Sequence, residues 1–361
     1  MPPPFLTKEV RMPDTTDPAA SPAADQVAQF EDHARGPVAS LQHFLHRNPT
    51  MVPVIVLALS VLGFGLLAPN FFSAFNLSLI MQQVAVVGTL AAAQSLVILT
   101  AGIDLSVGAI MLLSSVIMGK LAVIYGVPVP LAILLGLGVG LAAGALNGFL
   151  VTRLKLPPFI TTLGTWNIFL ALNYFISDRQ TIRSQTLDSD APLLKLFGER
   201  FNLGGAVLTW GVVLMLVVFV VLWYALYQTA WGRRVYAVGD DPEAAKLAGI
   251  QTNRVLMSVY MVAGLICGLA AWSAIGRVGS VSPTSFLESN LESITAVVIG
   301  GISLFGGRGS IIGPLIGALI VGVFNSGLRL MGVDVLWQLF ATGWLIIAAV
   351  AIDQWIRKVS A

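Results

Sequence analysis

The sequence predicts an all-α polytopic membrane protein with about ten transmembrane helices. Two observations lead to this fold class. Hydrophobic residues make up 56% of the 361 residues and charged residues only 11%, which is less than half the charged fraction of a typical soluble domain. In addition, apolar runs recur from Val52 to Trp355, and each is close to the roughly 20 residues that cross a bilayer as a helix.

Each predicted span is an apolar segment bounded by polar or turn-forming residues. The stretch from 78 to 124 is too long for one span, and its break falls at Ala101-Gly102-Ile103-Asp104. The eighth segment is short and could be re-entrant. The ten predicted spans are 51–68, 78–100, 104–124, 128–151, 159–177, 206–228, 255–276, 289–304, 310–331 and 335–355.

The residues before the first span predict a separate tail. Residues 1–26 are rich in Pro, Ala and Asp and contain no apolar core, which is typical of a disordered segment and not of a signal peptide. We therefore divide the chain into a disordered cytoplasmic N-terminal tail, 1–50, and a transmembrane domain, 51–358.

Composition excludes several chemistries. The one cysteine, Cys267, allows neither an internal disulfide nor a cysteine metal site. All three histidines, His33, His43 and His46, precede the first span, so no Ser–His or His–metal pair can form in the membrane core. We expect no catalytic residue, no metal and no nucleic-acid partner.

The sequence also limits the energy source of any transport. It contains no G-x-x-x-x-G-K-[ST] pattern, so the chain cannot hydrolyse ATP through a phosphate-binding loop of that kind. Acidic residues inside the spans are scarce, which disfavours a proton- or sodium-driven transporter.

The distribution of cationic residues predicts that both termini are cytoplasmic. With the N-terminus inside, 13 Lys and Arg residues fall in cytoplasmic segments and 5 in outer loops. Lys120 and Arg329 lie near the outer ends of spans, where long side chains can reach the interface. The opposite orientation would reverse the excess of positive charge on the inner side.

Asp104 is the carboxylate at the predicted break, in the stretch LTAGIDLSVGAIM. It could cap the third span by accepting free backbone N–H groups and complementing the helix dipole. Alternatively, Asp104 and Ser106 could form a cytoplasmic gate or pathway element. The two interpretations are compatible, because a cap at a break between spans can also be a hinge.

A ridge of glycines runs along the fourth predicted span. Glycines at every fourth position lie on one face of a helix, and small residues let helices approach closely in lipid. The ninth span repeats this pattern: a shift of 178 residues aligns Gly144 with Gly322. The predicted helix-packing residues are Gly136, Gly140, Gly144, Gly148 and Gly322.

The same shift of 178 residues aligns Asn147 with Asn325. The fourth and ninth spans cross the membrane in opposite directions, so the similarity predicts an inverted repeat of five plus five spans. Such repeats are typical of transporters, in which the two halves flank a central pathway. Chance similarity between glycine-rich apolar helices is the alternative.

Polar side chains inside otherwise apolar spans are the candidates for contact with a solute. Passage requires weak, replaceable hydrogen bonds, although each of these groups could instead hydrogen-bond a neighbouring helix. The candidate pathway residues are Gln82, Gln83, Gln94, Asn147 and Asn325.

Residues 229–254 form the longest internal cytoplasmic loop and predict a short helix. Asp240 or Asp241 can cap it, Pro242 suits its first position, and Gly249 ends it. A short helix outside the membrane has little to bury within its own chain. Docking of a cytoplasmic partner would explain it, and a solvated connector is the alternative.

Four blocks resemble the ribose-type permeases of ATP-binding-cassette importers. The resemblance covers about residues 50 to 358, nearly all of the chain outside the tail. The blocks are TAGIDLSVG at 100–108, GALNGFLVTRLKLPPFITTLGT at 144–165, GRRVYAVGDDPEAAKLAGI at 232–250 and AVVIGGISLFGGRGSIIGPLIGAL at 296–319.

The resemblance implies the fold and partners of a type II importer. It implies a permease homodimer in the lipid of the inner membrane, ATPase domains below it and a periplasmic sugar-binding protein above it. Mg–ATP would be bound by the ATPase partner, with no cofactor in this chain. Charges at 178–200, Arg277, Glu288 and Glu292 could dock the binding protein, or they could simply be solvated.

The resemblance also implies a coupling role for the cytoplasmic loop and a solute class. The solute would be a monosaccharide such as fructose or ribose. The alternatives are another small polar solute, such as a branched-chain amino acid, or a stand-alone facilitator or secondary transporter. The coupling residues implied are Arg233, Asp240, Asp241, Glu243, Ala244, Lys246, Leu247 and Gly249.

Overall fold

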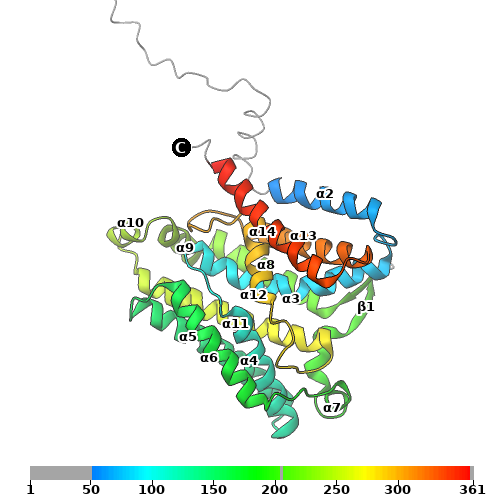
Figure 1. Ribbon diagram of the computed structural model, residues 1–361. Coiled ribbons are helices and arrows are strands. Elements are labelled where there is room, and N and C mark those ends of the chain that lie inside the picture. Colours follow the sequence, from blue (N-terminus) through cyan, green and yellow to red (C-terminus); the bar gives the residue numbers. More distant parts are fainter. Residues whose placement is uncertain (1–50, 204–205, 358–361) are drawn as a thin grey trace, which may run out of the picture. The chain divides into compact units, whose positions relative to one another are not determined.

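The computed structural model describes residues 51–203 and 206–357 (Figure 1). By its internal contacts the chain divides after Leu41, and all described residues belong to the second unit, 42–361. The predicted tail, 1–50, lies outside the described residues, so its disorder stays a prediction.

The described chain is almost entirely helical. A π-helical turn, η1 (Lys120–Ile124), extends α4 at its C-terminal end. The long helices are α2 (Met51–Leu67), α3 (Ala74–Leu99), α4 (Val107–Gly119), α5 (Val129–Thr152), α6 (Pro158–Ser177), α8 (Trp210–Gln228), α11 (Thr252–Val278), α12 (Ser289–Ile299), α13 (Ile312–Leu330) and α14 (Val335–Arg357).

Short elements lie between these helices. Two strands form an antiparallel hairpin in which Arg200 pairs with Thr209. The short elements are α7 (Ser184–Asp190), a 3₁₀ helix η2 (Pro192–Gly198), β1 (Arg200–Leu203), β2 (Ala206–Thr209), α9 (Ala230–Asp240) and α10 (Pro242–Leu247).

Each of the ten predicted spans contains a helix, but the helices differ in length. Among the described residues, 7 helices are long and apolar enough to cross a membrane, whereas α2, α12 and the apolar stretch Val335–Leu345 of α14 are shorter. The 11 residues of α12 rise only about 17 Å, roughly half of a hydrocarbon core. The structure thus supports a multi-pass helical protein, and the count of ten spans stays a prediction.

The predicted start of the sixth span was wrong. We expected a helix from residue 206, but residues 206–209 form β2 and the helix begins at Trp210. Ala-Val-Leu-Thr is a short apolar run that fits a strand as well as a helix. Its pairing with β1 decides the outcome, and the hydroxyl of Ser78 on α3 also donates to the carbonyl of Val207.

Helix α3 forms the centre of the described bundle. Its most apolar stretch is 89% buried, compared with 28% for α6. It contacts α8, α11, α12 and α13, as Figure 1 illustrates. Helix α6 instead exposes large apolar side chains, including Ile160 and Phe175, as expected where lipid or another apolar surface replaces water.

Candidate transport pathway and cytoplasmic junction

The break between α3 and α4 lies where the sequence predicts it. Helix α3 ends at Leu99, Ala101 has a left-handed φ of 59°, and α4 begins at Val107. Ser106 therefore occupies the N-cap position, and the interpretation of Asp104 as the cap is wrong. Asp104 lies two residues before the cap, within the connection, and its carboxylate accepts hydrogen bonds from Ser106.

Asp104 belongs to a buried chain of hydrogen bonds. The carboxylate is 2% exposed, and its Oδ1 accepts from the backbone N–H of Ser106 at 2.7 Å and from the Ser106 hydroxyl at 2.6 Å. The amide of Asn147, on α5, donates to Ser106 Oγ at 2.7 Å. The structure thus joins a predicted pathway residue to both predicted gate residues.

Two further side chains hold this connection and were not found from the sequence. Asn290, at the start of α12, accepts from the backbone N–H of Gly108 at 2.9 Å and donates to the carbonyl of Leu105. Thr162, on α6, accepts from the N–H of Leu105 at 3.1 Å. Because these partners are more than 50 residues away in sequence, spacing gives no signal for them.

The glutamines of α3 lie in different environments. Gln82 donates to Ser78 Oγ at 3.0 Å, and both Gln82 and Gln83 are partly buried. Gln94 is fully buried, and neither its Nε2 nor its Oε1 has a partner among the described residues. A buried polar group without a partner costs about 1–3 kcal/mol, so Gln94 stays a candidate pathway residue.

Asn325, on α13, belongs to a second group of polar side chains, which forms at the start of α12. Its amide donates to Glu292 Oε1 at 3.2 Å, which joins α13 to the first turn of α12. Nearby on α11, the guanidinium of Arg277 lies 5.4 Å from the centre of the Phe286 ring. Phe286 has a φ of 61°, which is strained for a bulky side chain.

The glycine ridge of α5 packs against α11. A methyl group at Gly140 would overlap the carbonyl oxygen of Gly264, and one at Gly144 would overlap that of Tyr260. Gly136 faces Met118 and Gly148 faces Met257. The backbones of α5 and α11 therefore approach more closely than any larger residue would allow.

Helix α10 lies in the loop between α8 and α11, which is predicted to be cytoplasmic, and has the predicted cap. Asp241 Oδ1 accepts from the N–H groups of Glu243 at 2.9 Å and Ala244 at 3.0 Å. Leu247 is 91% exposed, and Gly249 ends the helix with a φ of 83°. An apolar side chain this exposed on a polar helix is available to a partner.

Three of the sequence blocks meet at a junction beside α10. In the loop after α12, the N–H of Gly307 donates to the carbonyl of Leu99 at 3.0 Å. Tyr236, on α9, donates to the carbonyl of Gly309 at 2.9 Å. Burial, with a smaller contribution from Tyr227, raises the pKa of Tyr236, so its hydroxyl remains a donor at neutral pH.

Close backbone contact makes this junction tight. A methyl group at Gly239 would overlap the carbonyl oxygen of Leu99, and one at Gly306 would press on the backbone of Gly239 and Ala101. Arg308 Nε also lies 4.0 Å from Asp240 Oδ1, although both side chains are exposed. The end of α9 therefore packs directly against the end of α3, which leads into the connection that contains Asp104.

The remaining predicted coupling residues lie on the surface of α9 and α10. Arg233, Glu243, Ala244 and Lys246 are exposed. Within 51–203 and 206–357, no group of three or more His, Cys, Asp or Glu side chains could hold a metal ion.

The arrangement of long apolar helices around buried polar side chains, with the projecting helix α10, is that of a multi-pass membrane protein. A family model described as "branched-chain amino acid transport system / permease component" matches residues 76–350, and the chain belongs to this family.

Curated relatives align over most of the chain. It is 61% identical over 340 residues to the fructose import permease protein of Rhizobium meliloti, covering 94% of each chain. It is 40% identical to the ribose import permease protein of Bacillus subtilis, covering 86% of this chain and 95% of the relative. For the D-allose transport system permease protein of Escherichia coli, identity is 36%, with 84% and 91% covered. No solved structure matches.

Proposed function

We propose that the chain is the membrane-spanning subunit of an ATP-binding-cassette importer that moves a monosaccharide into the cytoplasm. The observation that carries this proposal is the 61% identity over 94% of the chain to a fructose import permease. The family description names branched-chain amino acids, but the relatives named above import fructose, ribose or allose. We expect fructose or a close relative as the solute.

The chain is a transport subunit, not an enzyme. As a permease component without a G-x-x-x-x-G-K-[ST] pattern, it depends on a separate ATPase that binds Mg–ATP. Helix α10 is the proposed seat of that ATPase, because it exposes Leu247 beside the charged Glu243 and Lys246. The contacts of Gly307 and Tyr236 connect this seat to the end of α3.

An inverted repeat of five plus five spans is supported by the pattern of helix contacts. Helix α5 contacts α11 as α13 contacts α3, and α4 contacts α5 as α12 contacts α13. In each half the asparagine of the fourth helix reaches a network at the start of the third. Asn147 reaches Ser106, and Asn325 reaches Glu292.

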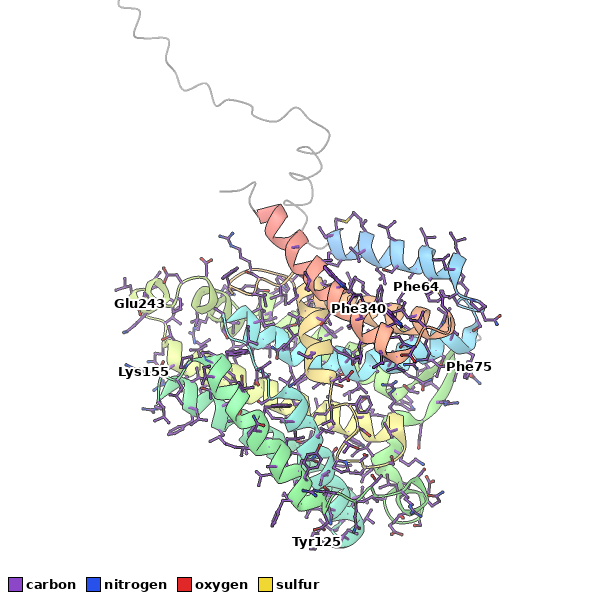
Figure 2. The ribbon with its side chains drawn as sticks, viewed as in Figure 1. Phe64, Phe75, Tyr125, Lys155, Glu243 and Phe340 are labelled. Carbon is purple, nitrogen blue, oxygen red and sulfur yellow. The ribbon has the colours of Figure 1, made fainter. Side chains whose placement is uncertain are left out.

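The proposed orientation places both termini and α10 on the cytoplasmic side of the inner membrane. Figure 2 shows Glu243 and Lys155, both predicted to be cytoplasmic, at one edge of the described part. Phe75 and Tyr125, predicted to lie near the outer side, are away from that edge. This separation agrees with the predicted topology, and the excess of positive charge is the basis for the proposed direction.

The proposed pathway runs between the two polar groups. Glu292 and Asn325 would meet the solute near the outer side, and the connection of Asp104 and Ser106 would close the inner side. Gln82, Gln83 and Gln94 line the way between them. We further propose a homodimer, to which the exposed apolar face of α6 would contribute, and a periplasmic binding protein docked on outer charges such as Arg179 and Arg183.

Transport by the reconstituted complex tests the proposal. The chain, its ATPase and the binding protein are placed in sealed vesicles, and uptake of labelled fructose, ribose, allose and leucine is measured with and without ATP. ATP-dependent uptake of a monosaccharide is expected. Leucine uptake would favour the amino-acid alternative, and accumulation without ATP or the ATPase would favour a secondary transporter.

A further inference from the structure

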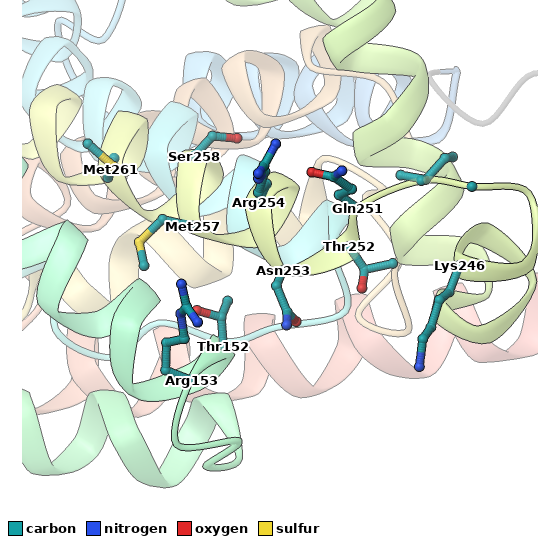
Figure 3. A pocket seen from close by; sticks show the side chains of 12 residues that line it. Thr152, Arg153, Lys246, Gln251, Thr252, Asn253, Arg254, Met257, Ser258 and Met261 are labelled. Carbon is teal, nitrogen blue, oxygen red and sulfur yellow. The ribbon is translucent and has the colours of Figure 1, made fainter.

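A groove of about 710 Å³ lies between the end of α5 and the start of α11, bordered by α10. Three cationic side chains line it: Arg153, Lys246 and Arg254. Figure 3 shows Arg153 at the end of α5 and Arg254 at the start of α11, with Met257 beside them. The groove is therefore built by three helices that meet only in the folded chain.

The positive charge of the groove is not neutralised by the protein. No Asp or Glu is among the described residues that line it. Within 51–203 and 206–357, none of the three cations pairs with a carboxylate within 4.0 Å. Three like charges around one cavity repel each other, so an anion bound among them gains from all three.

The start of α11 adds to this field, and the start of α10 shows the contrast. Helix α10 has Asp241 as its cap and Glu243 in its first turn. Helix α11 has no acidic residue in its first turn, and Gln251 at its N-cap makes no side-chain capping bond. The positive end of a 27-residue helix thus reaches the groove without a compensating charge.

One side of the groove is apolar, which distinguishes a lipid from a free ion. Met257 and Met261 line that side (Figure 3), and Leu154 and Leu156, next to Arg153 in the sequence, are 55% and 42% exposed. An inorganic anion would use only the cationic rim and would leave most of the volume unfilled. A phosphate ester that carries acyl chains satisfies both parts.

We infer that this groove binds the headgroup phosphate of an anionic phospholipid of the inner leaflet. The inference rests on the proposed orientation, which places α10 and the groove on the cytoplasmic side. The phosphate lies at Arg153 and Arg254, the chains follow the methionines, and Lys246 on α10 borders the groove.

The test measures retained lipid and therefore does not depend on solute or ATP. The complete permease–ATPase complex is equilibrated with an equal mixture of phosphatidylglycerol and phosphatidylcholine, and bound lipid is counted by native mass spectrometry. Selective retention of phosphatidylglycerol is expected. The double variant R153Q/R254Q should retain roughly ten-fold less, whereas K155Q, which removes a neighbouring cation outside the groove, should retain as much as the parent.

Four results of this measurement would each overturn the inference. They are equal retention of the two lipids, unchanged retention in R153Q/R254Q, a loss in K155Q equal to that in R153Q/R254Q, and displacement of the lipid by millimolar inorganic phosphate. Size-exclusion profiles of the variants verify that the complex remains assembled. The inference would also be contradicted if the isolated permease retained the lipid and addition of the ATPase released it, because the groove would then be a seat for protein.

Discussion

Each half of the bundle places an asparagine beside the start of a helix, but the two asparagines and their partners differ in how deeply they are buried. In the first half, Asn147 is fully buried and reaches Asp104 through Ser106, and the carboxylate is 2% exposed. In the second half, Asn325 and Glu292 are only partly buried. A buried network holds one end, whereas the polar side chains at the other end are partly accessible to solvent.

Gly144 and Gly322, which the proposed repeat aligns, differ in the same way. Gly144 faces the backbone of Tyr260 on α11, which cannot move without displacing a helix. Gly322 faces the side chains of Val84 and Ile80 on α3, which can change rotamer. At this pair of positions, an added side chain is therefore harder to accommodate in the first half than in the second.

The largest expected effect comes from filling the backbone contact. Gly144→Leu should abolish folded permease, because the added side chain forces α5 away from α11. Gly322→Leu should leave a measurable folded fraction, since overpacking against side chains typically costs about 1–3 kcal/mol. The monodisperse fraction on size-exclusion chromatography measures both. Equal yields from the two variants would remove the distinction between the halves.

Removing the buried carboxylate should have the next largest effect. Asp104→Leu leaves the N–H of Ser106 without an acceptor and leaves Ser106 Oγ without its carboxylate partner, and each such loss costs about 1–3 kcal/mol. Asp104→Asn keeps an acceptor oxygen and should lose less than half as much. Thermal unfolding in detergent measures the difference. Glu292→Leu serves as the comparison from the other half and should lower the stability by less than about 1 kcal/mol.

Local features of the structure could be predicted from the sequence because they depend on neighbouring residues. Gly102 and Asp104 interrupt an apolar run, and α3 does end before them. Asp241 followed by Pro242 is a pattern typical of a helix start, and α10 begins at Pro242 with Asp241 as its cap. These signals act within one turn, where backbone preference and capping decide the outcome.

Contacts between distant segments could not be predicted in this way. Asn290 lies more than 180 residues from Leu105 and Gly108, yet it joins both. The sequence placed Glu292 among the outer charges, but the structure packs it against Asn325. An apolar helix surface carries little pattern to define its neighbours, because lipid and protein interior favour the same side chains.

A change on the proposed coupling helix, α10, should affect ATPase stimulation without affecting the folding of the permease. Glu243→Arg reverses the charge at the start of α10 and should abolish solute-stimulated ATP hydrolysis in the reconstituted complex. Insertion and the yield of folded permease should be unchanged, because Glu243 is exposed. Lys155→Glu, a charge reversal at an exposed position between α5 and α6, is the matched control. Stimulation that survives in Glu243→Arg would show that α10 is not the seat of the ATPase.

The smallest expected effect is at the accessible end. Glu292→Gln keeps an oxygen that can accept from Asn325, so the stability should change little. Loss of the charge should weaken hydrogen bonds to sugar hydroxyls, and hydrogen bonds to charged groups contribute about 1.5–3 kcal/mol. We therefore expect roughly ten-fold slower uptake at low sugar concentration, with normal ATPase stimulation. Asn147→Asp, in the closed network, should instead lower stability, because it places a second carboxylate beside Ser106 and Asp104. If Glu292→Gln transported normally while Asn147→Asp changed solute preference, the accessible end would lie in the first half and the comparison would be reversed.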